Sequence, residues 1–310
     1  MSCVKEKPSQ KKLAVAVGNF DGLHRGHRLL LDELRRLAEE RGLMPAVVTF
    51  NPHPLALVNP AKVPKALQTP QQRRRELEAL GFKVIELVFD DELRHLSAEG
   101  FMRMLSERLD AALLLLGHDN RFGYRAPGKT DKESNEPLAE QYRRLALPLG
   151  MDVVPAPELP GISSSVVRKA LAEGKVEDAT VMLGHPYAIT SIVEHGKHLG
   201  HTIGFPTANL LPPEALQLPA TGVYLGTAVT DSGKRFPTMV NIGRRPTVDV
   251  PGAPLSIEAH LDGFSGDLYQ KLLTVEFHRR LRGEVRFDSV EALRGQLSKD
   301  LTALRREFSE

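Results

Sequence analysis

The first half of the chain alternates short apolar runs with amphipathic segments. Continuous apolar runs predict buried strands at 13–17, 45–50, 83–89, 111–116 and 151–155. The helical spacing of Leu30, Leu34 and Leu37 predicts a helix over 27–41, and similar patterns predict helices near 70–80 and 97–108. Strands without polar alternation are buried on both faces, so this order predicts a parallel sheet covered by helices on each side.

The pattern changes in the second half of the chain. Two short helices are expected between residues 162 and 184, and from Pro186 onward short β-branched runs are separated by glycine and proline. The runs are YAITSIVE, GVYLGTAVT, FPTMVNIG, SIEAHL and LLTVEF. Such spacing predicts an antiparallel barrel or sandwich, closed by a last helix over about 289–308. The boundary is expected near Gly184, which divides the chain into residues 1–183 and 184–310.

Composition agrees with two ordinary globular domains in 310 residues. The 41 basic and 39 acidic residues give a net charge of +2, which argues against a dedicated nucleic-acid binder. Cys3 is the single cysteine, so neither a disulfide within the chain nor a cysteine zinc site is expected. The N-terminal segment lacks the apolar core of a signal peptide, and AALLLLG is far shorter than the roughly 20 residues of a membrane span. We therefore expect a cytoplasmic protein without a membrane partner.

A candidate phosphate site follows the first predicted strand, in VGNFDGLHRGH at 17–27. A helix N-terminus offers unpaired N–H groups and partial positive charge, which suit phosphate. His24 and His27 are three residues apart and can project toward one point, where imidazoles can stabilise phosphate charge in a transition state. Two alternatives remain open: a zinc site, although no carboxylate or cysteine completes the set nearby, and two exposed histidines on an ordinary helix.

A second candidate site lies in HGKHLGHTIGFPTANL, residues 195–210. Its glycines allow backbone N–H groups to approach phosphate closely. Thr207 and Asn209 alternate onto one face of an extended segment, where their oxygens suit Mg²⁺. Glu258 lies in the predicted strand SIEAHL, and a carboxylate there can accept the proton of an attacking alcohol. The alternatives are a simple turn into a strand and a solvent-facing glutamate.

One motif is misleading. GYRAPGKT, residues 123–130, matches the phosphate-loop pattern G-x-x-x-x-G-K-[ST], which normally leaves a strand directly and opens an apolar helix. Here the pattern begins well past the strand at 111–116, and the polar segment DKESNEP that follows ends in a proline. We therefore expect a mobile loop here rather than a nucleotide-binding loop.

Taken together, the motifs of both halves resemble one family. GNFDGLHRGH, TFNPHP, GHDNRFG and ISSSVVR occur in the order typical of the FAD synthetase module of bifunctional riboflavin kinase/FAD synthetases. GFPTANL, TGVYLG, NIGRRPT, E-x-H-L, DLY and FDSVEALRGQLSKD are similar, in order, to the riboflavin kinase module. The resemblance implies a Rossmann-like nucleotidyltransferase sheet followed by an antiparallel barrel with a closing helix.

The resemblance also implies roles for individual residues. In the adenylylation site, His24, His27 and Arg168 would act on ATP phosphates, Gly18, Phe20, Gly22, Gly26, Asp119, Ser163 and Ser164 would bind the nucleotide, and Pro52 and His53 the flavin. In the kinase site, Glu258 would be the base, Thr207 and Asn209 would hold Mg²⁺, Gly196, Gly204 and Asn241 would contact the nucleotide, and Arg282 and Phe287 the flavin. Two positions depart from the family: Asn120 replaces an aromatic residue or histidine, and Gln270 replaces a glycine.

The activity implied is phosphorylation of riboflavin to FMN, followed by adenylylation of FMN to FAD with release of pyrophosphate. Its substrates would be flavins and ATP with Mg²⁺, and the protein would be a monomer or weak homo-oligomer without a nucleic-acid partner. Two alternatives stay open. In one, the chain is only a riboflavin kinase whose N-terminal module binds nucleotide or flavin without adenylylation. In the other, that module binds nucleic acid through the basic residues 73–75 and 143–144.

Overall fold

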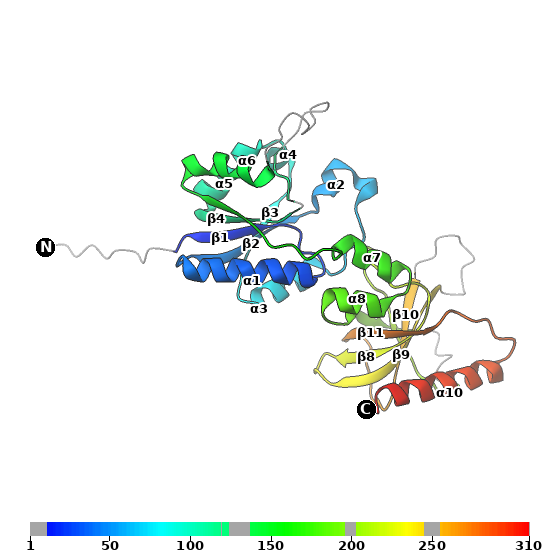
Figure 1. Ribbon diagram of the computed structural model, residues 1–310. Coiled ribbons are helices and arrows are strands. Elements are labelled where there is room, and N and C mark those ends of the chain that lie inside the picture. Colours follow the sequence, from blue (N-terminus) through cyan, green and yellow to red (C-terminus); the bar gives the residue numbers. More distant parts are fainter. Residues whose placement is uncertain (1–10, 119, 124–136, 196–202, 245–254, 310) are drawn as a thin grey trace. The chain divides into compact units, whose positions relative to one another are not determined.

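The computed structural model describes residues 11–118, 120–123, 137–195, 203–244 and 255–309 (Figure 1). The chain forms two compact units, which are described separately. The N-terminal unit comprises Met1–Pro64 and Thr69–Gly161, and the C-terminal unit comprises Lys65–Gln68 and Ile162–Glu310. No helix in the described ranges combines the length and apolar character that crossing a bilayer requires.

The N-terminal unit is built on a parallel sheet, as the apolar runs predict. Its five strands are β1 (Leu13–Val17), β2 (Met44–Asn51), β3 (Lys83–Val88), β4 (Ala111–Leu116) and β5 (Asp152–Pro155). They lie in the order β3-β2-β1-β4-β5, with every neighbouring pair parallel. The sequence order reverses at β1, so the carboxyl end of β1 is a switch point where ligands bind in such folds.

Helices cover both faces of this sheet (Figure 1). The helices are α1 (Arg25–Glu40), α2 (Pro54–Val58), α3 (Pro70–Ala79), α4 (Asp91–Arg94), α5 (Ala98–Leu109) and α6 (Leu138–Ala146), with short 3₁₀ turns at Pro60–Lys62 and Leu147–Leu149. α1 and α3 pack with one set of strand side chains, whereas α5 and α6 pack with the alternate set. Sequence patterns did not predict α2, α4 and α6. Helices α2 and α4 are too short to show a clear helical period, whereas α6 has nine residues and was missed despite its amphipathic pattern.

The C-terminal unit is a closed antiparallel barrel, which decides between the two predicted β architectures. Its strands are β6 (Tyr187–Glu194), β7 (Ala208–Leu210), β8 (Gly222–Thr230), β9 (Arg235–Arg244), β10 (Leu255–Leu261) and β11 (Leu272–Arg282). They close in the order β10-β7-β6-β11-β8-β9. The final helix α10 (Val290–Glu307) packs through Leu304 on Leu225 of β8 and Met239 of β9, outside the barrel core.

Helices α7 (Ser164–Ala172) and α8 (Val176–Leu183) belong to the barrel's unit. Val167 and Leu171 of α7 share a core with the inward side chains of the barrel strands. The short segment Lys65–Gln68 joins the same unit, where Ala66 pairs with Leu216. The compact units therefore divide between Gly161 and Ile162, while the division into catalytic modules near Gly184 stays a prediction.

Candidate active sites

The turn between β1 and α1 presents a histidine pair at a helix N-terminus. His24 is the N-cap of α1, and its Nδ1 accepts a hydrogen bond of 3.2 Å from the backbone N–H of His27. Because Nδ1 accepts, a neutral His24 carries its hydrogen on Nε2, which is then a donor. The amides of Arg25 and Gly26 begin the helix and have no carbonyl one turn back within it. The turn therefore combines backbone and imidazole donors suited to phosphate.

The ring of His27 lies flat against that of His24. The centroids of the two imidazole rings are 3.6 Å apart, with an interplanar angle of 15°. The ring of Phe20 also packs against His27, with its centroid 5.2 Å away. Burial holds the pKa of His27 well below its ordinary value, and the neighbouring His24 lowers it further. Nδ1 of His27 is buried and has no hydrogen-bond partner among the described residues. The lowered pKa keeps His27 neutral at pH 7.

A buried charge pair supports this turn, and sequence patterns did not find it. Asp21 of the turn and Arg73 of α3 are only 6% and 9% exposed. Burial lowers the pKa of Arg73, while the carboxylates of Asp21 and Glu86 favour its charged form. Of the arginines at 73–75, Arg73 is buried, while Arg74 and Arg75 are exposed and Arg74 is paired with Glu78 at 2.9 Å.

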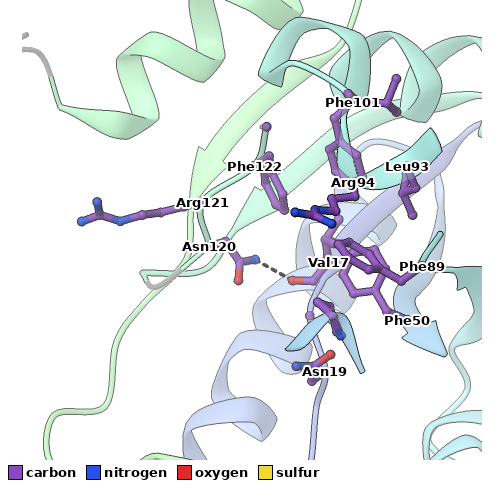
Figure 2. Close-up of a pocket in the computed structure, with 14 residues that line it drawn as sticks. Val17, Asn19, Phe50, Phe89, Leu93, Arg94, Phe101, Asn120, Arg121 and Phe122 are labelled. Carbon is purple, nitrogen blue, oxygen red and sulfur yellow. Dashed lines mark hydrogen bonds between the residues drawn. The ribbon is translucent and has the colours of Figure 1, made fainter. Parts of the chain in front are cut away.

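An aromatic cavity opens at the carboxyl end of β1 (Figure 2). It has a volume of about 310 Å³, and Phe50, Phe89, Phe101 and Phe122 form much of its wall. Phe101 and Phe122 are stacked at 4.8 Å, and Phe50 meets Phe89 edge to face at 5.6 Å. Gly18, a predicted phosphate residue, also lines it. A planar aromatic ligand suits such walls.

The loop that carries Phe122 is fixed by close backbone contacts. The hydroxyl of Tyr142 accepts from the N–H of Phe122 at 2.6 Å and donates to its carbonyl at 3.2 Å. Gly123 has a φ of +97°, and an added Cβ would lie 2.4 Å from the backbone nitrogen of Ala98. Only glycine fits here, so the residue places the loop against the start of α5.

The predicted flavin residues Pro52 and His53 follow β2, where the Asn51–Pro52 peptide is cis. Nδ1 of His53 accepts from the N–H of Leu55 at 3.1 Å, and its Nε2 lies 3.0 Å from the amide of Asn19. The Asn19 atom nearest to Nε2 is the amide nitrogen Nδ2. His53 is thereby tied to Asn19, which lines the cavity.

The predicted phosphate residues of ISSSVVR open helix α7 in the C-terminal unit. Ser163 is the N-cap, accepting from the N–H of Val166 at 3.3 Å, and Ser164 is the first helical residue. Arg168 donates through Nε to the carbonyl of Lys65 at 2.6 Å. This contact ties the predicted phosphate-binding arginine to the segment Lys65–Gln68.

On the barrel, three residues predicted from separate motifs lie side by side. Glu258 of β10 is in register with Asn209 of β7 on one side and with Asn241 of β9 on the other. Flanking residues Ile257 and Ala259 are buried in the barrel core, so Glu258 faces outward. Cross-strand neighbours on one face have Cβ atoms about 5 Å apart, so one carboxylate and two amides meet at one place.

Thr207 shares the outward face of Asn209, because Ala208 and Leu210 point into the core. His260 anchors this segment, with its Nδ1 2.8 Å from the carbonyl of Pro206. Since a carbonyl only accepts, His260 donates from Nδ1. The hydroxyl and amide oxygens of Thr207 and Asn209 are hard donors that fit Mg²⁺ completed by water and phosphate. Within the described ranges, no group of three histidine, cysteine or acidic residues is placed to hold a metal.

A further carboxylate and a buried ion pair lie in the same unit as Glu258, Asn209 and Asn241. An added Cβ on Gly243 would lie 2.3 Å from Oε1 of Glu284, so Gly243 leaves room for that side chain. Arg282, predicted to contact flavin, donates from Nη2 to Asp300 of α10 at 2.7 Å. The side chain of Asp300 is 3% exposed, so it fixes the guanidinium of Arg282. Phe287 is half-buried in the following segment.

The remaining positions singled out from the sequence lie in turns or outside the described residues. Gln270 has a φ of +60°, the left-handed conformation for which glycine is favoured, which is consistent with the glycine that the resemblance implies at this position. Gly204 is exposed with a φ of +83°. Asp119 and Gly196 lie outside the described residues, as does nearly all of the GYRAPGKT motif.

Comparisons with known proteins cover both units. The riboflavin kinase family model matches residues 183–308, and the FAD synthetase family model matches residues 6–144. The bifunctional riboflavin kinase/FMN adenylyltransferase of Pseudomonas fluorescens is 36% identical, over 96% of this chain and 94% of that protein. The one of Bacillus subtilis is 35% identical, over 98% and 95%.

A solved structure from Streptococcus pneumoniae, titled as a macrolide-efflux protein, is similar over both units. Its TM-score is 0.80 at 29% identity, covering 97% of this chain and 95% of that one. The relatives that match over nearly their full length are named for both riboflavin kinase and FMN adenylyltransferase activity. The alternative of a riboflavin kinase without adenylylation is therefore not favoured. The chain belongs to the family of bifunctional riboflavin kinase/FMN adenylyltransferases.

Proposed function

We propose that the barrel phosphorylates riboflavin at the row formed by Glu258, Asn209 and Asn241. The ribityl 5′-hydroxyl loses its proton to the carboxylate of Glu258, and its oxygen attacks the γ-phosphorus of ATP. The bond to the β–γ bridging oxygen breaks, so the products are FMN and ADP. Because Glu258 lies outside the barrel core, it is accessible to substrate on this face.

Thr207 and Asn209 would hold Mg²⁺ together with the ATP phosphates. When bound, the cation neutralises charge that develops on the transferring phosphoryl group. His260 supports this pair by holding the carbonyl of Pro206. Asn241, on the opposite side of Glu258, is placed to donate its amide to a substrate oxygen.

The N-terminal unit adenylylates FMN. An oxygen of the FMN phosphate attacks the α-phosphorus of a second ATP, and pyrophosphate leaves. No covalent enzyme intermediate is required, so the protein contributes position and charge stabilisation. The donor on Nε2 of His24 and the first amides of α1 would bind phosphate oxygens.

The flavin ring of FMN would occupy the aromatic cavity at the end of β1. Four phenylalanines provide faces and edges for a planar ring, and the phosphate-binding turn begins at the same strand end. The predicted flavin residues Pro52 and His53 lie next to this cavity through the contact of His53 with Asn19.

The observation that carries the proposal is the alignment of Glu258 with Asn209 and Asn241 in a chain whose relatives carry both activities in their names. The test is incubation with riboflavin, ATP and Mg²⁺, with FMN and FAD separated by chromatography. FAD should accumulate, His27→Ala should stop at FMN, and chelation of Mg²⁺ should halt FMN formation. A wild-type enzyme that stops at FMN would refute the adenylylation step. Sedimentation velocity tests the expected monomer or weak homo-oligomer.

A further inference from the structure

Four polar side chains line the N-terminal cavity: Asn19, Arg94, Asn120 and Arg121. Asn19 contacts His53, and Arg121 points away from the phenylalanines (Figure 2). The other two, Asn120 and Arg94, line the cavity together with the phenylalanines. Neither is explained by the phosphate chemistry of the turn that follows β1. The hydrogen-bonding groups of Asn120 and Arg94 are therefore considered as contacts for the ligand of the cavity.

The orientation of Asn120 is fixed by the backbone. Its Nδ2 donates to the carbonyl of Val17 at 2.5 Å, and its backbone N–H donates to the carbonyl of Gly117 at 3.1 Å. A carbonyl only accepts, so the amide nitrogen must face Val17. Oδ1 of Asn120 then faces away from that carbonyl, as Figure 2 shows, so a residue that lines the cavity keeps an acceptor that this bond does not use.

Arg94 supplies donors on the same wall. Its side chain extends from α4 toward Phe122 and Asn120 (Figure 2). The ion pair with Asp91 is long, at 3.5 Å, and the side chain of Arg94 is 34% exposed. A guanidinium has five N–H donors in a fixed plane, so among the described residues this ion pair leaves most of them to water or a ligand.

The pyrimidine edge of an isoalloxazine ring carries a donor, N3–H, between two acceptors, the carbonyls at C2 and C4. The opposite end of the ring system is an apolar dimethylbenzene. Resting on the proposed function, we propose that Asn120 and Arg94 recognise this edge in FMN. Oδ1 of Asn120 accepts from N3–H, Arg94 donates to a carbonyl beside it, and the phenylalanines enclose the rest of the ring.

Adenine is the competing occupant, because its N6 amino group donates and its N1 accepts. The tricyclic flavin is favoured by the extent of the aromatic wall, to which four separate segments contribute Phe50, Phe89, Phe101 and Phe122. The flavin is also favoured by its apolar dimethyl end, which suits this lining better than a second polar edge. Substrate analogues separate the two occupants.

The experiment measures kcat/KM for FAD formation from supplied FMN and from 3-methyl-FMN, in which a methyl group replaces the N3 hydrogen. Wild type, Asn120→Ala and Arg94→Met are compared, with Arg103→Met, an ion-paired arginine on α5, as the matched control. Wild type should discriminate against 3-methyl-FMN about tenfold or more, since the analogue leaves the acceptor unpaired. Asn120→Ala should lower kcat/KM for FMN while its discrimination falls close to unity.

Arg94→Met should raise KM for FMN about tenfold and leave KM for ATP unchanged, because only the flavin carbonyl loses a donor. An unchanged KM for ATP in the adenylylation reaction reports that the N-terminal unit of each variant is folded, because riboflavin phosphorylation uses the barrel. Equal discrimination in wild type and Asn120→Ala would overturn the proposal, as would a change in discrimination against N6-methyl-ATP instead of 3-methyl-FMN. If wild type forms no FAD at all, the adenylylation proposal fails, and the same ratios measured as dissociation constants by flavin fluorescence still test the recognition of N3–H.

Discussion

Glu258 and Asn209 are direct cross-strand partners, although one lies in SIEAHL and the other in GFPTANL. Antiparallel pairing brings the proposed base and the proposed cation ligand onto one outward face, and Asn241 completes the row from the other side. Glu194 of β6 is also in register with Asn209. Two carboxylates therefore flank this asparagine, and the proposed chemistry assigns the proton transfer to one of them.

Replacing Glu258 with glutamine should remove the base while keeping the size and shape of the side chain. We expect FMN formation from riboflavin to fall about 10²–10⁴-fold, the usual contribution of a general base. FAD formation from supplied FMN should be unchanged, because that step uses the N-terminal unit. Chromatography of both products in one assay gives the two rates.

Glu194→Gln is the matched control, since it alters the other carboxylate that flanks Asn209. It should retain most of the kinase activity. If Glu194→Gln lost as much activity as Glu258→Gln, the assignment of the base to Glu258 would be wrong.

The sheet and the barrel could be predicted because each strand has a recognisable pattern of apolar residues in its own short segment of sequence. The uninterrupted run LAVAV at 13–17 is buried at every position, as a strand covered on both faces must be. The motif residues Thr207, Asn209 and Glu258 could likewise be assigned in advance, because an alternating strand puts them on a known face. Their common register depends on loop lengths and pairing, which the sequence does not show.

The aromatic cavity could not be predicted, because its walls come from distant segments and each phenylalanine resembles an ordinary core residue. The burial of Arg73 could not be predicted either, because in a run of three arginines composition does not show which one α3 turns inward toward Asp21. The motif ISSSVVR did not show that Val167 and Leu171 of α7 pack in the barrel's core, and its role at the adenylylation site stays a prediction.

His27 should stay neutral well below the pH at which an ordinary histidine is protonated. Burial and the adjacent His24 both disfavour its charged form, which lowers its pKa in the folded state. A titration of imidazole resonances by NMR should show His27 unprotonated at pH 6. Bound ATP should raise this pKa, because phosphate charge stabilises the imidazolium. A His27 midpoint near 6.5 without ligand would contradict the assignment.

The same shift predicts a dependence of stability on pH. The folded-state pKa of His27 lies below the unfolded value of about 6.5, so the unfolded chain binds more protons as pH falls through that range. The free energy of unfolding should therefore decrease below about pH 6.5, and His27→Gln should reduce this decrease. Urea unfolding at pH 7.5 and 5.5 measures it, with His95→Gln at an exposed position as the control.

Asp300→Ala should destabilise the barrel strongly, because it leaves the guanidinium of Arg282 without its carboxylate. The side chains of Arg282 and Asp300 are only 19% and 3% exposed, and removal of one partner from such a pair typically costs about 3–5 kcal/mol. Asp262→Ala is the control, since its partner Arg305, also on α10, is 63% exposed and such pairs contribute about 0–1 kcal/mol. Urea unfolding followed by circular dichroism compares them. Equal effects would show that Asp300 does not hold a buried charge.

Gly123→Ala should impair adenylylation without affecting riboflavin phosphorylation. The added Cβ would lie 2.4 Å from the backbone nitrogen of Ala98, so the loop with Phe122 must move and the cavity wall with it. We expect KM for FMN to rise about tenfold, as for loss of about 1.4 kcal/mol of binding. Gly150→Ala is the control: its φ of +68° gives similar backbone strain, but no atom lies within 4 Å of the added Cβ. Equal losses of adenylylation in the two variants would mean that strain, rather than displacement of Phe122, is responsible.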